Sequence, residues 1–133
     1  MIPDWVAPYI GIPFRDRGRE RSGCDCWGLV RMVLAERAGV ALPSYSDEYL
    51  SAQDRRHLEG VIVGQMGSWF AVDAPQPLDV ILMRRLSVAA HIGVAVTPNH
   101  VLHVESGRTS AVERMSRSGL SQSIVGYYRH KDT

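Results

Sequence analysis

The chain has only two cysteines, Cys24 and Cys26, separated by one residue. A disulfide between them would need diverging side chains or a strained loop, so we expect none. Two sulfur atoms alone also leave a zinc site incomplete. We therefore interpret both residues as free thiols of a protein made in a reducing compartment.

The chain also has little net charge and no long apolar run. The formal net charge is +1 over 133 residues, which argues against general attraction to nucleic acid or to a membrane surface. No apolar run approaches the roughly 20 residues that span a bilayer. Residues 1–5 lack the basic and apolar regions of a signal peptide, so we expect synthesis in the cytoplasm. The length predicts a single domain, 1–133.

The strongest helical pattern begins at Cys26. Apolar residues recur at steps of three and four over 26–38, Asp25 is a suitable N-cap, and Gly39 is a suitable stop. The Cys26 thiol then lies in the first helical turn, where backbone N–H groups and the helix dipole favour a thiolate. Because the thiolate is the reactive form of cysteine, Cys26 is positioned as a nucleophile.

The segments on either side of this helix give weaker signals. Residues 1–22 predict at most a short helix, followed by a charged loop. Four arginines of that loop are either solvated or in contact with an anionic substrate: Arg15, Arg17, Arg19 and Arg21. Ser46 to His57 predicts a second helix, and 58–66 a weaker third. We expect a linker from Trp69 and Phe70 to Pro75 and Pro77.

After Pro77 the apolar period becomes two, which indicates strands. The predicted strands cover 79–84, 91–97, 100–105, 111–115 and 124–129. Residues 87–90, between the first two strands, are expected to be flexible. Helices followed by an antiparallel meander indicate an α+β fold.

The chain has five histidines that could act as the base for a cysteine nucleophile, and the pattern favours His91. A turn at 97–99 predicts a hairpin in which paired residue numbers sum to about 197. His91 and His103 then lie on neighbouring strands, so that His103 could orient the ring of His91 in a triad of the Cys-His-Asn type. His100 has the opposite parity to His103, so the two do not converge on a metal. Taken alone, a histidine on a strand is more often structural.

Several segments, in this order, resemble the NlpC-type family of bacterial cell-wall cysteine peptidases. They are Phe14, Asp25–Val30, Pro77–Val80, His91–Val94 and Leu102–Val104. The resemblance implies a papain-like α+β fold, with the cysteine at a helix N-terminus packed on an antiparallel sheet. It implies hydrolysis of peptidoglycan stem peptides, typically between D-γ-glutamate and meso-diaminopimelate. Cys26 matches the nucleophile, His91 the general base and His103 the third polar residue; no metal or other cofactor is implied.

The substrate-binding side of the site is expected to involve the helix start and two aromatic residues. Backbone N–H groups around Cys26 and Asp25 would meet the oxyanion. The family often has a tyrosine at the position of Phe14, whose hydroxyl is missing here; Tyr9 could replace it only if the loop folds back. Trp27 stands where a serine is commoner, and either forms a wall beside the thiol or packs in the core. Cys24 is interpreted as a small buried residue.

The small size, Trp27 and the segment 124–130 resemble the branch of this family that is encoded with phage tail genes, including those of gene transfer agents. That resemblance implies synthesis in the host cytoplasm, tail or baseplate proteins as partners, and action on the periplasmic cell wall. It implies neither nucleic-acid binding nor membrane insertion. The alternatives are an adaptor subunit of a tail tip with a weak or silent site, and an amidase or acyltransferase on the same fold.

Overall fold

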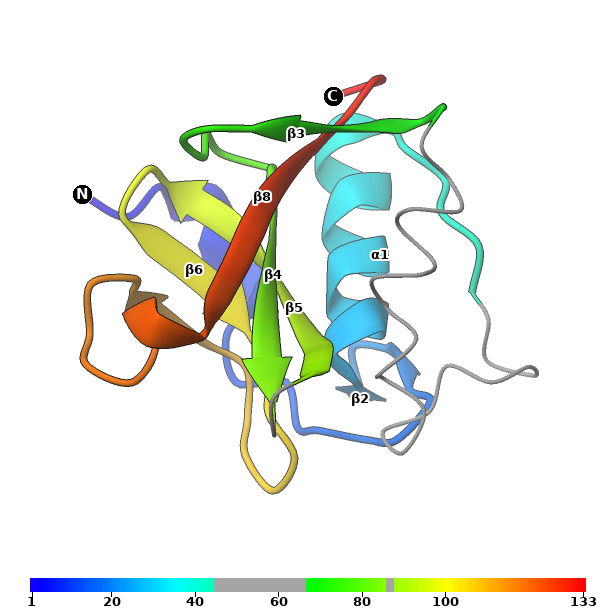
Figure 1. Cartoon of the computed structure of the whole chain (residues 1–133). Coiled ribbons are helices and arrows are strands. Elements are labelled where there is room, and N and C mark those ends of the chain that lie inside the picture. The colour runs from blue at the N-terminus through cyan, green and yellow to red at the C-terminus, as the bar shows by residue number, and fades with distance from the viewer. Residues whose placement is uncertain (45–66, 86–87) are drawn as a thin grey trace.

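The computed structural model describes residues 1–44, 67–85 and 88–133. The helices predicted at 46–57 and 58–66 fall outside these ranges. Within the described part, the helix α1 (Cys26–Ala38) packs beside a six-stranded antiparallel sheet (Figure 1). None of the helices in the described ranges is long and apolar enough to cross a bilayer.

Both predicted ends of α1 are confirmed. The Asp25 side chain accepts a hydrogen bond from the Gly28 backbone N–H, which is the contact of an N-cap. Gly39 ends the helix in the left-handed conformation, with φ 68°, which costs a glycine little. The face between these ends is apolar, with Leu29 and Leu34 fully buried against the sheet.

The sheet runs in the order β3-β8-β4-β5-β6-β7. Its strands are β3 (Trp69–Val72), β4 (Val80–Arg85), β5 (Val88–Thr97), β6 (His100–His103), β7 (Ala111–Arg114) and β8 (Ile124–His130). The meander β4 to β7 follows the predicted strands closely, and β8 returns between β3 and β4. α1 contacts β5, a central strand of the sheet.

Two sequence predictions for this sheet are wrong. Trp69 and Phe70 do not begin a linker: they open β3, whose backbone groups pair with β8 from Trp69↔His130 to Val72↔Tyr127. Pairing across more than fifty residues cannot be detected in a local pattern. The predicted strand 91–97 starts too late, because β5 begins at Val88, which pairs with Arg85 of β4; residue 87 lies outside the described residues.

The hairpin of β5 and β6 differs from the predicted register by one. Val94 pairs with Leu102 and Ala95 with Val101, and an irregularity follows before Thr97↔His100. The extra residue between Ala95 and Thr97 is a bulge, which shifts the pairing on its far side. Continuing the regular register places His103 opposite Gly93.

Alternation along the strands gives the sheet two apolar faces. Val80, Leu82, Ile92, Val94 and Leu102 join the α1 core, whereas Ile81, Met83, Ala95 and Val101 form a second cluster with Met115 and Leu120. The chain before α1 contains a short 3₁₀ helix, η1 (Asp4–Tyr9), as expected. It also contains a small ribbon of β1 (Arg19–Glu20) and β2 (Gly23–Cys24), where only a loop was predicted. Another short 3₁₀ helix, η3 (Ser121–Ser123), precedes β8.

Candidate active site

Asp25 fixes the start of the helix that carries Cys26. Its carboxylate accepts hydrogen bonds from the backbone N–H groups of Gly28, at 2.8 Å, and Arg17, at 3.2 Å. The Arg19 guanidinium forms an ion pair with the same carboxylate at 2.7 Å, and the Asp25 side chain is only 1% exposed. Because a buried carboxylate is stable when it is paired and hydrogen-bonded, Asp25 can hold Cys26 at the first position of α1.

The backbone of Asp25 already makes a contact that competes with an oxyanion. Its N–H donates to the Gly18 carbonyl oxygen at 3.3 Å. It could bind an oxyanion only if that hydrogen bond were broken. The oxyanion role of the backbone at Asp25 and Cys26 stays a prediction.

Glycines allow the loop before α1 to lie against the first helical turn. A Cβ on Gly28 would lie 2.1 Å from the Gly18 carbonyl oxygen and 3.2 Å from the Cβ of Cys24. A Cβ on Gly18 would lie 2.4 Å from the carbonyl oxygen of Gly23. Both contacts are with backbone atoms that cannot turn aside. The loop that positions Cys26 therefore requires glycine at both positions.

The two predicted histidines are joined in one hydrogen-bonded chain. His91 Nε2 lies 2.9 Å from His103 Nδ1, and His103 Nε2 lies 2.5 Å from Glu113 Oε2. His91 is fully buried and His103 is 3% exposed. Cys26 is also fully buried, and its helix packs on β5, the strand that carries His91. The structure thus brings His103 to His91 as the sequence predicted.

Gly93 makes the contact between the two rings possible. It lies on β5 two residues after His91 and opposite His103. A Cβ there would lie 2.6 Å from Val101 Cγ2, 2.9 Å from the Leu102 carbonyl oxygen and 3.1 Å from His103 Cβ. The His103 ring can lean along the strand toward His91 because this position carries no side chain.

Glu113 is the third member of this series of hydrogen bonds, and the sequence did not predict it. β7 pairs with β6 through His103↔Ala111 and Val101↔Glu113, so Glu113 is the diagonal neighbour of His103 on one face of the sheet. Glu113 also accepts a hydrogen bond from Arg117 Nη2 at 3.2 Å. The parity of the predicted strand 111–115 was the available signal, because it places 111 and 113 on one face.

The environment keeps Glu113 ionised. Partial burial raises the pKa of its carboxyl, but the contact with His103 and the Arg117 guanidinium act against that effect, and the pKa is lowered overall. A carboxylate is therefore the form that faces His103 at neutral pH.

The two aromatic residues expected near the substrate, Trp27 and Phe14, both pack against the core around α1. Trp27 is 1% exposed and its indole N–H donates to the Pro43 carbonyl oxygen at 2.8 Å, so it packs in the core; its place as a wall of the site stays a prediction. Phe14 packs partly buried against the α1 core and bridges to Cys24.

Tyr9 does not replace the hydroxyl that Phe14 lacks. Its O–H donates to Glu36 Oε1 at 2.6 Å. Glu36 lies ten residues beyond Cys26 on α1, about 15 Å along the helix axis. Burial and the neighbouring Glu36 raise the pKa of Tyr9 to about 12.

Cys24 is buried, and two of the four arginines pair with carboxylates of the protein. Cys24 is fully buried, and burial, followed by the charges of Asp25 and Cys26, raises the pKa of its thiol to about 12, which suits a packing role. Arg19 pairs with Asp25, and Arg21 pairs with Glu36 at 2.5 Å. Arg19 and Arg21 thus bind carboxylates of the protein itself, whereas the sequence had suggested solvent or an anionic substrate as their partners.

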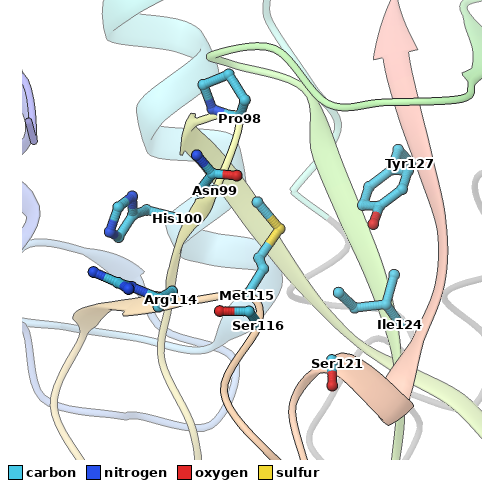
Figure 2. A pocket seen from close by; sticks show the side chains of 9 residues that line it. All are labelled: Pro98, Asn99, His100, Arg114, Met115, Ser116, Ser121, Ile124 and Tyr127. Carbon is cyan, nitrogen blue, oxygen red and sulfur yellow. The ribbon is translucent and has the colours of Figure 1, made fainter.

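Two hollows lie at different places on the surface of the sheet. One hollow, of about 440 Å³, is bordered by His103, Glu105, Arg108, Thr109, Ala111, Glu113 and Arg117. A larger one, of about 600 Å³, lies between the β5–β6 turn, the end of β7 and the start of β8 (Figure 2). His100 lines this second hollow and contacts Thr97 Oγ1 at 2.8 Å, so its ring is separate from that of His103. None of the three predicted catalytic residues lines the larger hollow.

A possible donor set for a metal lies in the first hollow. Ligand atoms of His103, Glu105 and Glu113 lie within 4.8 Å of one another. His103 Nε2 is already hydrogen-bonded to Glu113, and Arg117 brings a positive charge to the same carboxylate. These contacts favour a hydrogen-bonded chain over a cation site at this position.

The comparisons with known proteins agree with one another. A model described as the NlpC/P60 family matches residues 11–129. The murein DD-endopeptidase MepS/murein LD-carboxypeptidase of Escherichia coli K12 is 24% identical over 115 residues, covering 86% of this chain and 54% of that protein. The protein of the same name in E. coli O157:H7 gives the same values. The chain spans about half the length of the curated relatives it matches.

Solved structures give the same fold. The NlpC/p60 domain of the peptidoglycan hydrolase SagA has a TM-score of 0.62 at 19% identity, with 92% of each chain covered. A lipoprotein-like NLP/P60 protein of Staphylococcus aureus has a TM-score of 0.64 at 21% identity, covering 95% of this chain and 39% of the other. An NlpC/P60 protein of Bacillus cereus has a TM-score of 0.67 at 16% identity, covering 98% and 41%. The α+β fold, with Cys26 at the helix start, is the papain-like fold of these proteins.

Proposed function

Because the chain belongs to the NlpC/P60 family, we propose that it is a cysteine endopeptidase that hydrolyses stem peptides of peptidoglycan. The observation that carries the proposal is the buried contact between His91 and His103 on β5 and β6, beside the helix that begins at Cys26. The organisation of a nucleophile, a base and a residue that orients the base is the requirement for cysteine-based acyl transfer.

The reaction would begin with transfer of the Cys26 thiol proton to His91. His103 contacts Nε2 of His91, so Nδ1 is the nitrogen that would take this proton. The thiolate would then attack the carbonyl carbon of the peptide bond. As the C–N bond breaks, His91 returns the proton to the leaving amine, and a thioester to Cys26 is formed. Water deprotonated by His91 would hydrolyse the thioester and release the thiol.

The bond between D-γ-glutamate and meso-diaminopimelate is the one we propose for cleavage, following the family resemblance. The E. coli relatives carry names for DD-endopeptidase and LD-carboxypeptidase activities, which would yield other fragments. Mass spectrometry of the products distinguishes these bonds directly, because each leaves a different terminal residue.

Carriage by a phage-like tail is a further proposal, and it rests on the resemblance of Trp27 and the segment 124–130 to the tail-associated branch. Synthesis in the host cytoplasm, delivery to the periplasmic wall and tail or baseplate partners belong to it. An adaptor subunit with a weak or silent site is the second candidate. It is favoured by the missing hydroxyl at Phe14, since the Tyr9 hydroxyl is engaged with Glu36.

The test is incubation of purified protein with diaminopimelate-type murein, followed by mass spectrometry of the soluble fragments. We expect fragments that end in γ-D-glutamate from the wild type and none from Cys26→Ala. His91→Ala should also abolish hydrolysis, whereas His103→Ala should retain part of it because His103 orients the base without accepting the thiol proton. Equal digestion by wild type and Cys26→Ala would refute the peptidase proposal. Normal particle function of Cys26→Ala, with stable binding to tail proteins, would support the adaptor.

A further inference from the structure

Glu113 ends the hydrogen-bonded chain that starts at His91. We propose that Glu113 is a positioning residue which, through His103, determines which nitrogen of His91 is basic. This inference rests on the proposed function, since it extends the same catalytic group from three residues to four. The observations behind it are the two contacts of 2.9 Å and 2.5 Å that join three neighbouring strands.

The direction of the chain follows from the chemistry of its last member. An ionised carboxylate can only accept hydrogen bonds, so His103 Nε2 must carry the proton that lies between the two groups. In a neutral His103 ring the other nitrogen, Nδ1, is then an acceptor. His91 Nε2 therefore donates to His103 Nδ1, and the neutral His91 ring has its lone pair on Nδ1. That nitrogen can accept a thiol proton.

Without the carboxylate, this direction is no longer imposed. His103 could carry its proton on Nδ1 and donate it to His91 Nε2. A neutral His91 would then hold its own proton on Nδ1 and could not act as a base there. The same carboxylate also stabilises the positive charge that His91 gains, because a charged acceptor strengthens hydrogen bonds along the chain.

The contact with Arg117 predicts which atom of the side chain at 113 would face His103 in a Glu113→Gln variant. Its guanidinium has no acceptor and contacts the same Oε2 atom that His103 contacts. In a Glu113→Gln variant, this shared position would be taken by the amide oxygen, because an amide NH₂ there would face two donors. Glu113→Gln should thus keep the proton direction and lose only the charge. Glu113→Leu should lose both.

The experiment needs a control for the other charged side chains near the His91–His103–Glu113 hydrogen bonds. Glu105, Arg108 and Arg117 border the same hollow as His103 and Glu113. Glu105→Gln removes one negative charge from this hollow, as Glu113→Gln does, and is the matched control for a general charge effect.

The experiment compares wild type, Glu113→Gln, Glu113→Leu and Glu105→Gln. One readout is the pH dependence of Cys26 alkylation by iodoacetamide, with the modified residue assigned by tandem mass spectrometry. The other is the tautomer of each ring from long-range ¹H–¹⁵N spectra. We expect Glu113→Leu to shift the alkylation profile upward by about one pH unit, and to give His91 rings protonated on Nδ1. Glu113→Gln should shift the profile and keep the wild-type tautomers. Glu105→Gln should keep the wild-type tautomers and shift the profile by less than Glu113→Gln does, because its charge lies near His103 without ending the hydrogen-bonded chain.

An assay of murein hydrolysis distinguishes failure of this inference from failure of the proposed function. We expect Glu113→Leu to hydrolyse murein about 10- to 100-fold more slowly, a smaller loss than the ~10²- to 10⁴-fold effect of a general base. If the wild type digests no murein but the profile and tautomers shift as described, the peptidase proposal fails and the role of Glu113 stands. Unchanged tautomers and profile in folded Glu113→Leu, or equal shifts in Glu105→Gln, would overturn the role of Glu113. If Glu113→Leu melts too early to study, an unshifted alkylation profile in Glu113→Gln would do the same.

Discussion

Gly28 is the position where local helix preference and tertiary packing make opposite demands. In the first turn of α1, alanine is preferred over glycine by up to about 1 kcal/mol. The structure places the Gly18 carbonyl oxygen 2.1 Å from where an alanine Cβ would lie. That distance is too short for any non-bonded pair, and the obstacle is backbone that is itself hydrogen-bonded to the Asp25 N–H.

The expected size of the effect follows from these two terms. Overpacking of a tight site costs about 1–3 kcal/mol, and occasionally more. Movement of the loop would also weaken the Asp25 cap, whose loss is worth about 1 kcal/mol. The clash therefore exceeds the gain in helix preference, and we expect Gly28→Ala to be destabilised by about 1–3 kcal/mol. Since the displaced loop holds the start of α1, hydrolysis should fall by more than the loss of folded protein explains.

The assay is urea unfolding of Gly28→Ala beside Ala35→Gly. Ala35 is exposed in the last turn of the same helix, so its change to glycine measures helix preference with little packing. We expect Ala35→Gly to lose up to about 1 kcal/mol and to keep its hydrolytic activity. A Gly28→Ala protein as stable as the wild type, or more stable, would refute the reasoning, because helix preference alone would then account for the site.

Two further outcomes test the assignments of Cys24 and Tyr9. Cys24→Ala should keep full murein hydrolysis, since a buried thiol with a pKa raised to about 12 is protonated at neutral pH; loss of activity with an intact fold would contradict this. Tyr9→Phe should lose about 0.5–1.5 kcal/mol of stability near pH 7, from the missing bond to Glu36, and urea unfolding measures it. Because the folded-state pKa of Tyr9 is raised to about 12, its contribution is complete below pH ~10 and is lost as pH rises toward 12, so the difference between the two proteins should shrink over that range. A constant difference would argue against the Tyr9–Glu36 bond.

The helix at the nucleophile could be predicted because its signals are local. Asp25, Gly39 and the apolar residues between them specify α1 within fifteen residues, and the structure confirms both ends. The strands of the meander were predicted for the same reason, since neighbouring strands pair with each other. β3 was missed because Trp69–Val72 depends on β8, which is more than fifty residues away in the chain.

In the candidate site, too, the local features could be predicted and the long-range ones could not. His91 and His103 lie on consecutive strands, so alternation and the hairpin turn were enough to bring them together. Trp27 could not be assigned from sequence, because its environment depends on the Pro43 carbonyl across a loop. The bulge after Ala95 also could not be foreseen, and it changed the register by one without moving His103 away from His91.

Burial along the hydrogen-bonded chain explains why the charge lies at its far end. His91 is fully buried, His103 is 3% exposed, and the side chain of Glu113 is 30% exposed on β7, one of the two edge strands of the sheet. An ionised carboxylate beside His91 would lose most of its hydration, which costs several kcal/mol unless it is fully paired. At the sheet edge the carboxylate keeps part of its hydration and the Arg117 contact, while the His103 ring transmits its influence to His91. Two strand spacings therefore separate the charge that sets the direction of the chain from the nitrogen that would accept the proton.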